Sequence, residues 1–530
     1  MFPTRRTPGC ETARRTRRLP YARRTAALGL ASLVFVLGAN SLPSTATPLG
    51  SAATPLGSAA LRPGAPPFSP AAAPQIHQGP FTDVFPPDEF AARRARVMDR
   101  IGDAVAVLQG TVERPGEQPF RQNNQFFYLS GVEVPRAILV VDGRSHESTL
   151  YLPPRDERRE RAQGPEIFVG REAVELTGVD AVLPRADFLE TVEELGRGRR
   201  VLYTPHRPEV LGNASAGDVR RQAEATSTDP WDGRPSREQT FIGKLEAAAP
   251  GARIRDLDPV LDALRVIKSE REVALIREAT RITGLAIEEV MREAEPGMLE
   301  YELQAPAELV FKKYGAQGAA YFALVATGTN TFYSHYHRGT RVLADGDLVQ
   351  YDYAPDYRYY VSDVTRAFPA NGKFSPLQRE LYTIYLRMYR AVLSSIRPGE
   401  PVPGLLREAG RKIDAIIADF EFTDPDIRAA AEQFAARYRD SRRTSFGHAI
   451  GMAVHDVRDG DASQGLRPGE VFTIEPAIKV PELGLAMRLE DVLLVTEDGY
   501  ENLSDWVPIE IDDIERVMAE LGVSRLIDKR

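Results

Sequence analysis

The sequence predicts an α+β protein with two folded domains, preceded by an N-terminal segment that belongs to neither. Three observations support this fold class. Short apolar runs alternate with helical spacing over residues 90–255, an amphipathic helix is predicted at 269–293, and further helices and strands follow it. The chain has 530 residues, of which 43% are hydrophobic, and this is enough to bury a core in each domain.

The first 46 residues are predicted to be a cleaved secretory signal. Eight arginines precede an apolar stretch at 26–39, and small residues at 44–46 offer a cleavage site. The pair Arg23-Arg24 resembles a twin-arginine signal. The apolar stretch is shorter than the roughly 20 residues of a membrane span, which favours cleavage over an uncleaved anchor. We therefore expect an exported protein, periplasmic or secreted, with no stable membrane association after cleavage.

Residues 47–80 are predicted to be a low-complexity linker. They begin with two copies of TPLGSAA, at 47–53 and 54–60, and they remain rich in Pro, Ala and Gly. Such a segment has too few large apolar residues to form a core. The two folded domains are accordingly expected at 81–260 and 261–530.

Charge and cysteine content restrict the function. Residues 1–46 contain eight Arg and one Glu, so the rest of the chain has 59 basic and 74 acidic side chains and a net charge of −15. Nucleic-acid phosphates need a basic surface, so a nucleic-acid partner is not expected. The only cysteine, Cys10, lies in the predicted signal. Any metal in the mature protein must therefore bind to His, Asp or Glu.

The first domain is predicted to be α/β. Its expected strands are 104–109, 136–141, 148–152 and 200–203, and its expected helices are 88–101 and 188–195. Residues 212–238 are polar and turn-rich, which indicates a surface insertion.

The second domain is predicted to open with the helix 269–293. Apolar residues recur there at every third position from Val273 to Ile282 and mark one buried face. Another helix is predicted to start at Ser375, because Ser at the N-cap, Pro at the first position and Gln at the third form a strong start signal.

Four carboxylates of the second domain occupy apolar strand contexts, where charge is costly unless it is paired or bound to metal. Asp352 lies in LVQYDY and Asp363 in YYVSDVTRAF. A turn at 357–358 would place these two opposite each other on a hairpin, with Cβ atoms about 5 Å apart, and their repulsion would call for a cation. Glu475 lies in VFTIEP and Glu490 in MRLED. Each alone is compatible with a structural ion pair, but all four in one domain favour a metal site.

Histidines lie in the same domain. His448 and His455 occur in GHAIGMAVHD, and His335 and His337 occur in YSHYH. The order of the four carboxylates with His448 between them, and the eleven-residue step from Asp352 to Asp363, resemble the pita-bread metallopeptidases, closest to aminopeptidase P and prolidase. The resemblance covers about residues 85–520. Further stretches that resemble this family are FYLSG at 127–131, DVTRAFPANGKFSPLQRELY at 363–382 and HAIGMAVHD at 448–456.

The resemblance implies a pita-bread catalytic domain behind a smaller α/β domain, with a dinuclear metal site. Asp352 would bind one ion, Asp363 and Glu490 would bridge two, His448 would bind the other, and Glu475 would complete the set. Oxygen ligands with a single imidazole favour Mn²⁺, although Co²⁺ and Zn²⁺ are possible. The family chemistry implies a bridging hydroxide as nucleophile.

The resemblance also implies roles for residues around the metals. Glu475 would move protons, His335 and His455 would contact the substrate carbonyl, and Arg488 would hold the carboxylates. His337 has no family counterpart and is expected to be structural.

The chain departs from the family pattern at two places. Tyr353-Ala354-Pro355 follows Asp352, where a small residue and Gly are usual, and Thr444 stands where prolyl-specific members have a histidine.

The expected function is removal of the N-terminal residue from peptides with proline in the second position. An Xaa-Pro dipeptidase or a related hydrolase is the alternative within enzymes, and a catalytically inactive pita-bread binding module is the alternative outside them. A peptide substrate and a homo-oligomer are expected as partners.

Overall fold

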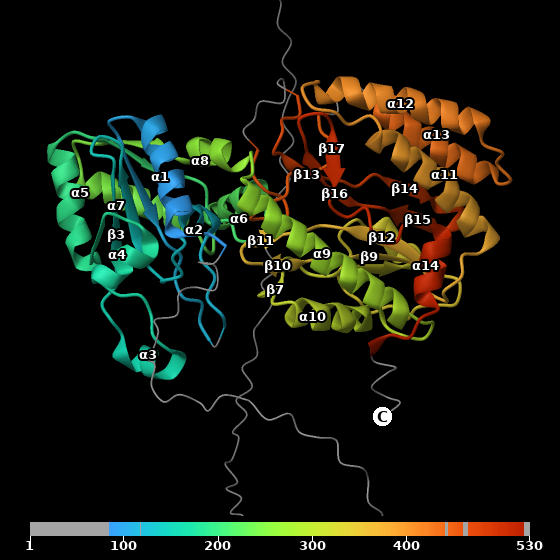
Figure 1. Ribbon diagram of the computed structural model, residues 1–530, viewed down its shortest axis with the longest axis horizontal. Coiled ribbons are helices and arrows are strands. Elements are labelled where there is room, and N and C mark those ends of the chain that lie inside the picture. The colour runs from blue at the N-terminus through green and yellow to red at the C-terminus, as the bar shows by residue number, and fades with distance from the viewer. Residues whose placement is uncertain (1–83, 117, 440–443, 459–464, 524–530) are drawn as a thin grey trace, which may run out of the picture. The chain divides into compact units, whose positions relative to one another are not determined.

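The computed structural model describes residues 84–523 apart from 117, 440–443 and 459–464 (Figure 1). The predicted signal and linker, at 1–80, lie outside the described residues. Within the described part of the chain, no helix has the length and hydropathy needed to cross a bilayer. The structure contains mixed helices and strands, as the sequence predicts.

The first domain contains a six-stranded sheet with the strand order β4-β3-β2-β1-β5-β6. Its strands are β1 Val105–Gln109, β2 Ile138–Asp142, β3 Glu147–Leu152, β4 Ala181–Pro184, β5 Val201–Thr204 and β6 Arg253–Asp256. The central strands β1, β2 and β3 are antiparallel, whereas β4, β5 and β6 pair in parallel at the two edges. All four predicted strands are confirmed within two residues, and β4 and β6 are additional.

Helices cover both faces of this sheet, which explains why its strands are almost continuously apolar. The helices are α1 Pro87–Ile101, α2 Asn124–Ser130, α3 Glu157–Gln163, α4 Arg171–Thr177, α5 Phe188–Arg197, α6 Ala216–Thr228, α7 Arg237–Ala248 and α8 Asp258–Arg265. Val105 and Val107 of β1 pack in a cluster with α5 and α7, while Ala106 and Leu108 pack in the cluster that includes α1. Both predicted helices of this domain, α1 and α5, are confirmed.

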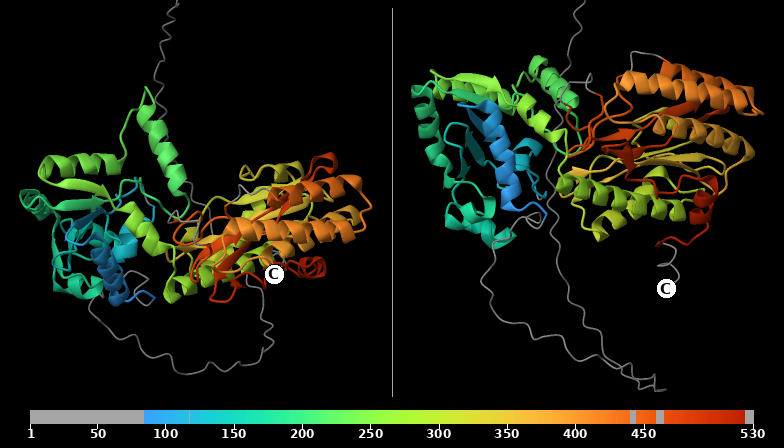
Figure 2. Two further views of the ribbon diagram at one scale, coloured as in Figure 1. Left: turned by 90° about the horizontal axis from the view of Figure 1, so that it is seen from above. Right: turned by 45° about the horizontal axis from the view of Figure 1, so that its top comes forward.

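The segment 212–238 is on the surface, as predicted, but it is not made of turns. It contains helix α6, which has no buried residue and stands out from the sheet domain (Figure 2, left, in green). Ser215 caps this helix, because its hydroxyl accepts a hydrogen bond from the Asp218 N–H and the Asp218 carboxylate accepts one from the Ser215 N–H. The polar composition is therefore that of an exposed helix.

The second domain combines short β-ribbons with long helices. Its helices are α9 Glu270–Glu293, α10 Gln304–Lys313, α11 Pro376–Leu393, α12 Val402–Asp419, α13 Pro425–Arg439 and α14 Ile511–Met518. Ser269 and Ser375 cap α9 and α11 in capping boxes, so both predicted helix starts are confirmed. The predicted buried face of α9 is confirmed at Ile276 and Ile282, but Val273 at its start is only half-buried.

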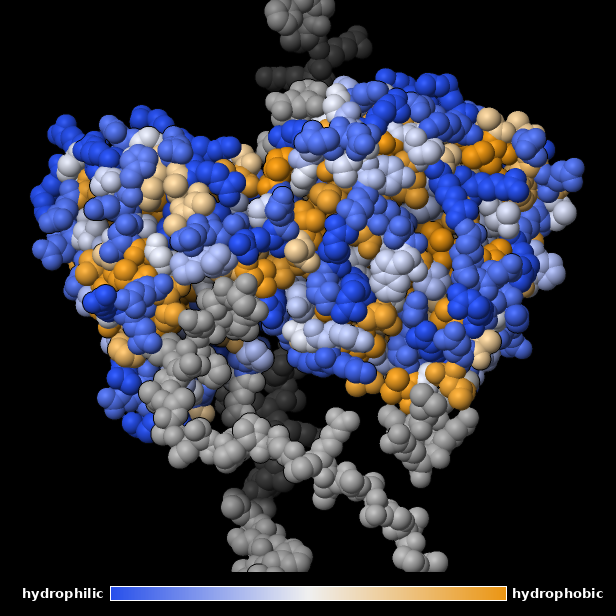
Figure 3. All heavy atoms as spheres, viewed as in Figure 1, coloured by the Kyte–Doolittle hydropathy of each residue, from blue (hydrophilic) through white to orange (hydrophobic). Residues whose placement is uncertain are grey.

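The strands of this domain form four small sheets. They are β7 Gly318–Ala319, β8 Leu324–Thr327, β9 Leu348–Asp352, β10 Pro355–Tyr357, β11 Tyr360–Val361, β12 Thr365–Pro369, β13 Val471–Ile474, β14 Ala477–Val480, β15 Leu485–Arg488, β16 Asp491–Val495 and β17 Tyr500–Asn502. Helices α12 and α13 pack against each other beside these strands (Figures 1 and 2). Hydrophilic residues cover most of the face shown in Figure 3, with apolar residues between them in small groups.

Buried polar contacts join the sheet domain to the second domain. The Arg121 guanidinium lies 2.6 Å from Asp356, and the Tyr359 hydroxyl donates a 2.6 Å hydrogen bond to Glu133. Arg265, at the end of α8, lies 2.5 Å from Asp456. Asp456 follows His455 directly, so these contacts help to fix the histidine-bearing loop.

Candidate metal centre

The first pair of candidate ligands lies where a hairpin is interrupted. Strands β9 and β12 pair with Asp352 opposite Thr365, and β10 and β11 continue in the same register to a turn at Arg358 and Tyr359. Both turn residues have positive φ, 53° and 71°, as a tight two-residue hairpin turn requires. The turn therefore lies one residue beyond the predicted position.

The predicted facing of Asp352 and Asp363 is wrong in detail. Asp363 lies in the gap between β11 and β12, and the common register places it diagonally to Asp352 rather than opposite it. Because diagonal positions in an antiparallel pair share a face, both carboxylates still point to the same side. They meet at the hydroxyl of Tyr321, which lies 2.6 Å from Asp352 Oδ1 and 2.7 Å from Asp363 Oδ1.

The second pair of candidate ligands lies at a similar interruption. Ile474 of β13 pairs with Asp491 of β16, and Ala477 of β14 pairs with Arg488 of β15, again in one continuous register. Glu475 and Glu490 occupy the unpaired position between the two ribbons, opposite each other. Both pairs of carboxylates, Asp352 with Asp363 and Glu475 with Glu490, thus lie where the pairing of two strands is interrupted. The four side chains can converge there on one metal centre.

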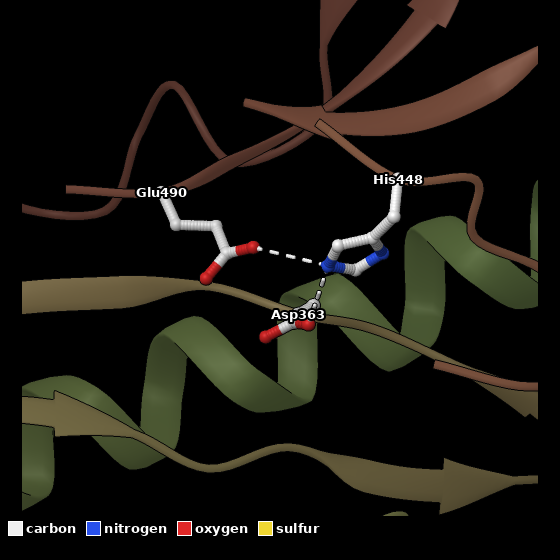
Figure 4. Close-up of side chains that lie close together, drawn as sticks. All are labelled: Asp363, His448 and Glu490. Atoms are coloured by element: carbon white, nitrogen blue, oxygen red, sulfur yellow. Dashed lines mark ion pairs between the residues drawn. The ribbon is translucent and has the colours of Figure 1, made fainter. Parts of the chain in front are cut away.

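His448 is held beside these carboxylates by backbone pairing with β13. Its carbonyl accepts a 2.8 Å hydrogen bond from the Thr473 N–H. Its Nε2 lies 3.4 Å from Asp363, 3.4 Å from Glu475 and 3.7 Å from Glu490. One atom each from Asp363, His448 and Glu490 lie within 4.8 Å of one another (Figure 4). This spacing would let all three reach one cation.

Arg488 contacts two of the four clustered carboxylates, those of Asp352 and Glu475. Its guanidinium contacts Asp352 directly and lies 3.3 Å from Glu475. Burial alone would lower the pKa of Arg488. The nearby carboxylates of Asp352, Glu490 and Glu475 outweigh this effect and raise that pKa above its ordinary value. The side chain is therefore a permanent cation that orients these acids, which is the role that the family resemblance implies for it.

Two contributors were not predicted from the sequence. Tyr321 joins Asp352 to Asp363, and Thr365 donates a 2.7 Å hydrogen bond to Glu490 Oε2. No motif marks Tyr321. Thr365 has one indication, its place two residues after Asp363 on the same strand face.

The charge balance of the site fits a bound cation. Burial, together with the neighbouring carboxylates, raises the pKa values of Asp363 and Glu490 well above their ordinary range. Glu490 Oε1 is buried and has no hydrogen-bond partner among the described residues. The neighbouring Asp491 is equally buried, but it is held by Arg366, Tyr389 and Ser504, which lower its pKa against the effect of burial. Glu490 has Thr365 and Arg488 near Oε2 only, at 2.7 Å and 3.9 Å, and a divalent cation at Oε1 would supply the missing charge.

His455, His335 and His337 differ in their distance from His448 and in their exposure to solvent. The rings of His455 and His448 lie 4.1 Å apart, and those of His335 and His455 lie 6.5 Å apart. Burial, with His448 and His335 nearby, lowers the pKa of His455 to about 4, so its ring is neutral at neutral pH. His335 is exposed. His337 packs on the exposed ring of Phe322, 4.4 Å away, in keeping with a structural role.

A cavity of about 550 Å³ opens onto the site. Its lining includes His448, His455, Glu475 and Arg488. Thr444 lines a neighbouring cavity of about 160 Å³, and the next residue, Ser445, borders both. Thr444 therefore lies beside the site cavity, one residue away from its wall.

Replacing Tyr321 with Phe is expected to weaken metal binding by about 10-fold to 100-fold, because the shared donor that orients Asp352 and Asp363 is lost. Titration of the metal-free protein with Mn²⁺ measures the effect. The matched control is Tyr353→Phe, since the Tyr353 hydroxyl lies 3.0 Å from Glu308 and does not touch a candidate ligand. Equal affinities for wild type and Tyr321→Phe would show that the hydroxyl does not organise the ligands.

Both halves of the chain are similar to known metallopeptidases. Residues 90–203 match the model of the aminopeptidase P N-terminal domain, and residues 274–497 match that of metallopeptidase family M24. Xaa-Pro aminopeptidases from Escherichia coli and Haemophilus influenzae are 30% and 31% identical, over 81% and 82% of this chain and 97% of each relative. The structure of zinc-substituted Escherichia coli aminopeptidase P in complex with product is similar with a TM-score of 0.65 at 30% identity, covering 82% of this chain and 98% of that one.

Proposed function

Since the chain belongs to metallopeptidase family M24, among its aminopeptidase P members, we propose that it removes the N-terminal residue from peptides with proline in the second position. The observation that carries the proposal is the convergence of Asp363, His448 and Glu490 beside a cavity of about 550 Å³. That cavity is large enough for a short peptide.

We propose a centre of two divalent cations. Asp352 would hold one, His448 the other, and Asp363 and Glu490 would be shared, with Glu475 completing the set. The donor set of carboxylates with one imidazole favours Mn²⁺, with Co²⁺ or Zn²⁺ as alternatives. When bound, the cations would supply an activated water and polarise the scissile carbonyl.

The protein side chains would provide the remaining steps. Glu475 is half-buried and borders the cavity, so it can accept a proton from the attacking water and pass it to the leaving nitrogen. His455 is neutral at neutral pH and can donate a hydrogen bond to the developing oxyanion, with His335 beside it. Arg488 keeps Asp352 and Glu475 in place.

The proline preference is proposed because the prolyl amide nitrogen carries no hydrogen and its φ is fixed, so general peptidases handle it poorly and a dedicated site is useful. The relatives carry the name Xaa-Pro aminopeptidase, which supports the same substrate class for this chain. An Xaa-Pro dipeptidase is the second candidate, since the same chemistry would serve either peptide length.

A peptide panel in added Mn²⁺ tests the proposal. We expect rapid hydrolysis of Xaa-Pro-Xaa tripeptides, slower hydrolysis of Xaa-Pro dipeptides, and at least about 10-fold lower kcat/KM on Xaa-Ala-Xaa. A dipeptide preferred over the tripeptide would favour the dipeptidase. Equal rates with Pro and Ala in the second position would contradict the proline preference and leave only the general aminopeptidase activity.

A further inference from the structure

One face of the β14–β15 ribbon continues from the metal centre into the cavity. Ala477 pairs with Arg488, and Lys479 pairs with Ala486. Alternate residues of a strand share a face, so Ala477 and Lys479 follow Glu475 on the side that carries Arg488. On this face Arg488 lies opposite Ala477, and Lys479 lies opposite Ala486. Because the alanine side chains are small, they leave space above the ribbon between Glu475 and Lys479.

The distance along the ribbon identifies the part of the substrate that would meet Lys479. Lys479 lies four positions after Glu475, about 13 Å away at the rise of a strand. An aminopeptidase substrate has a single residue on the amino side of the scissile bond, which extends only about 3.5 Å. A side chain so far from Glu475 can therefore meet only the leaving part of the peptide. Because the lysine side chain is long, the position it reaches is two or three residues beyond the scissile bond.

The charge of Lys479 is available to a ligand. The exposed side chain borders the site cavity and donates a 2.8 Å hydrogen bond to the Phe332 carbonyl, at the end of the 3₁₀ turn Gly328–Phe332. Among the residues that the structure describes, no carboxylate forms an ion pair with it. An ammonium group has three donors, so two remain after the bond to Phe332.

A second cation borders the same cavity. Arg437, on α13, donates a 2.5 Å hydrogen bond to the Ala477 carbonyl of β14, and its guanidinium lies 4.9 Å from the ring centre of Phe434. Arg437 and Lys479 therefore reach the cavity from two elements, α13 and β14. Two basic side chains therefore line the cavity in addition to residues of the metal centre.

We propose that Lys479, with Arg437 lining the same cavity, forms a subsite for a carboxylate on the leaving part of the peptide, two or three residues beyond the scissile bond. The carboxylate is either the free C-terminus of a short peptide or an acidic side chain at that position. This subsite rests on the proposed aminopeptidase activity and adds a preference for short or acidic peptides to it.

The test compares wild type with Lys479→Gln on paired substrates in added Mn²⁺. The free acid Ala-Pro-Ala and its C-terminal amide differ only in the carboxylate. We expect wild type to prefer the acid by about 10-fold in kcat/KM, as a charge-assisted hydrogen bond allows. Lys479→Gln should lose this preference and keep its rate on the amide, while Lys479→Arg should retain it. Lys244→Gln, on the exposed surface of α7, is the matched control and should leave both rates unchanged.

A second substrate pair separates the two sources of the carboxylate. Ala-Pro-Ala-Glu amide and Ala-Pro-Ala-Gln amide have no free C-terminus and differ only in side-chain charge. A preference of wild type for the Glu peptide that Lys479→Gln loses assigns the subsite to acidic side chains as well. A preference confined to the free acid assigns it to the C-terminus.

The outcomes distinguish this proposal from a structural role. If Lys479 only ties β14 to Phe332, Lys479→Gln lowers the rates on acid and amide alike, and the subsite is overturned. It is also overturned if wild type distinguishes neither the acid from the amide nor the Glu peptide from the Gln peptide. Failure of the proposed function is a different result, since wild type would then hydrolyse neither the acid nor the amide.

Discussion

Glu490→Gln is expected to abolish peptide hydrolysis and to reduce the bound divalent metal to one ion per chain or none. The amide cannot supply the negative charge that a shared ligand requires, although it preserves the size of the side chain and can still accept the bond from Thr365. Metal analysis of the purified protein and the rate on an Xaa-Pro-Xaa tripeptide measure the two effects. Asp363→Asn should behave in the same way.

The thermal stability of metal-free Glu490→Gln shows whether the substitution has removed only the metal site or has also damaged the fold. The raised pKa of Glu490 means that its ionised form is disfavoured in the metal-free fold, because of burial and of Asp363 and Glu475. At pH values above that pKa, a neutral amide removes this penalty. Metal-free Glu490→Gln is therefore expected to have a Tm equal to or above that of metal-free wild type.

The matched control for this substitution is Glu482→Gln, an exposed residue of the same region that should keep full metal content and rate. A Glu490→Gln enzyme with two ions per chain and a near-normal rate would contradict the assignment of this residue as a shared ligand.

Local signals explain the parts of the fold that the sequence predicts well. The capping residues Ser269 and Ser375 fix the starts of α9 and α11, and apolar runs bounded by turn residues mark the strands of the sheet domain. Helix α6 was missed because its composition is polar, although Ser215 and Asp218 form a capping box that the sequence displays.

The site was predicted from acidic residues in apolar strands, and this signal has a physical limit. An acidic residue in an apolar strand is known to need a partner, but the pattern does not give its position in the sheet. The diagonal arrangement of Asp352 and Asp363 follows from the strand register and from the interruption of the hairpin, which the pattern does not show. Tyr321 lies in the segment between β7 and β8 and reaches the site only through tertiary packing. Lys479 joins the cavity through the register of β14 with β15, which no local pattern specifies.

His455→Ala is expected to lower kcat by roughly 10² to 10³ and to leave the metal content unchanged. Its ring lies 4.1 Å from that of His448 and borders the cavity, but it does not belong to the compact group formed by Asp363, His448 and Glu490. Burial and the neighbouring His448 and His335 lower its pKa to about 4, so at neutral pH its ring is neutral and can donate a hydrogen bond. Steady-state kinetics on the tripeptide and metal analysis measure the two expectations together.

Two comparisons make this expectation specific. His337→Ala removes an imidazole from the exposed face beside Phe322 and should leave both kcat and metal content unchanged. His455→Gln keeps a side-chain N–H donor, so it should recover part of the rate if hydrogen bonding to the oxyanion is the role of this residue. Loss of metal from His455→Ala would instead place His455 among the ligands. An unchanged kcat would remove it from the catalytic machinery, because a donor aimed at the developing charge cannot be deleted without raising the barrier.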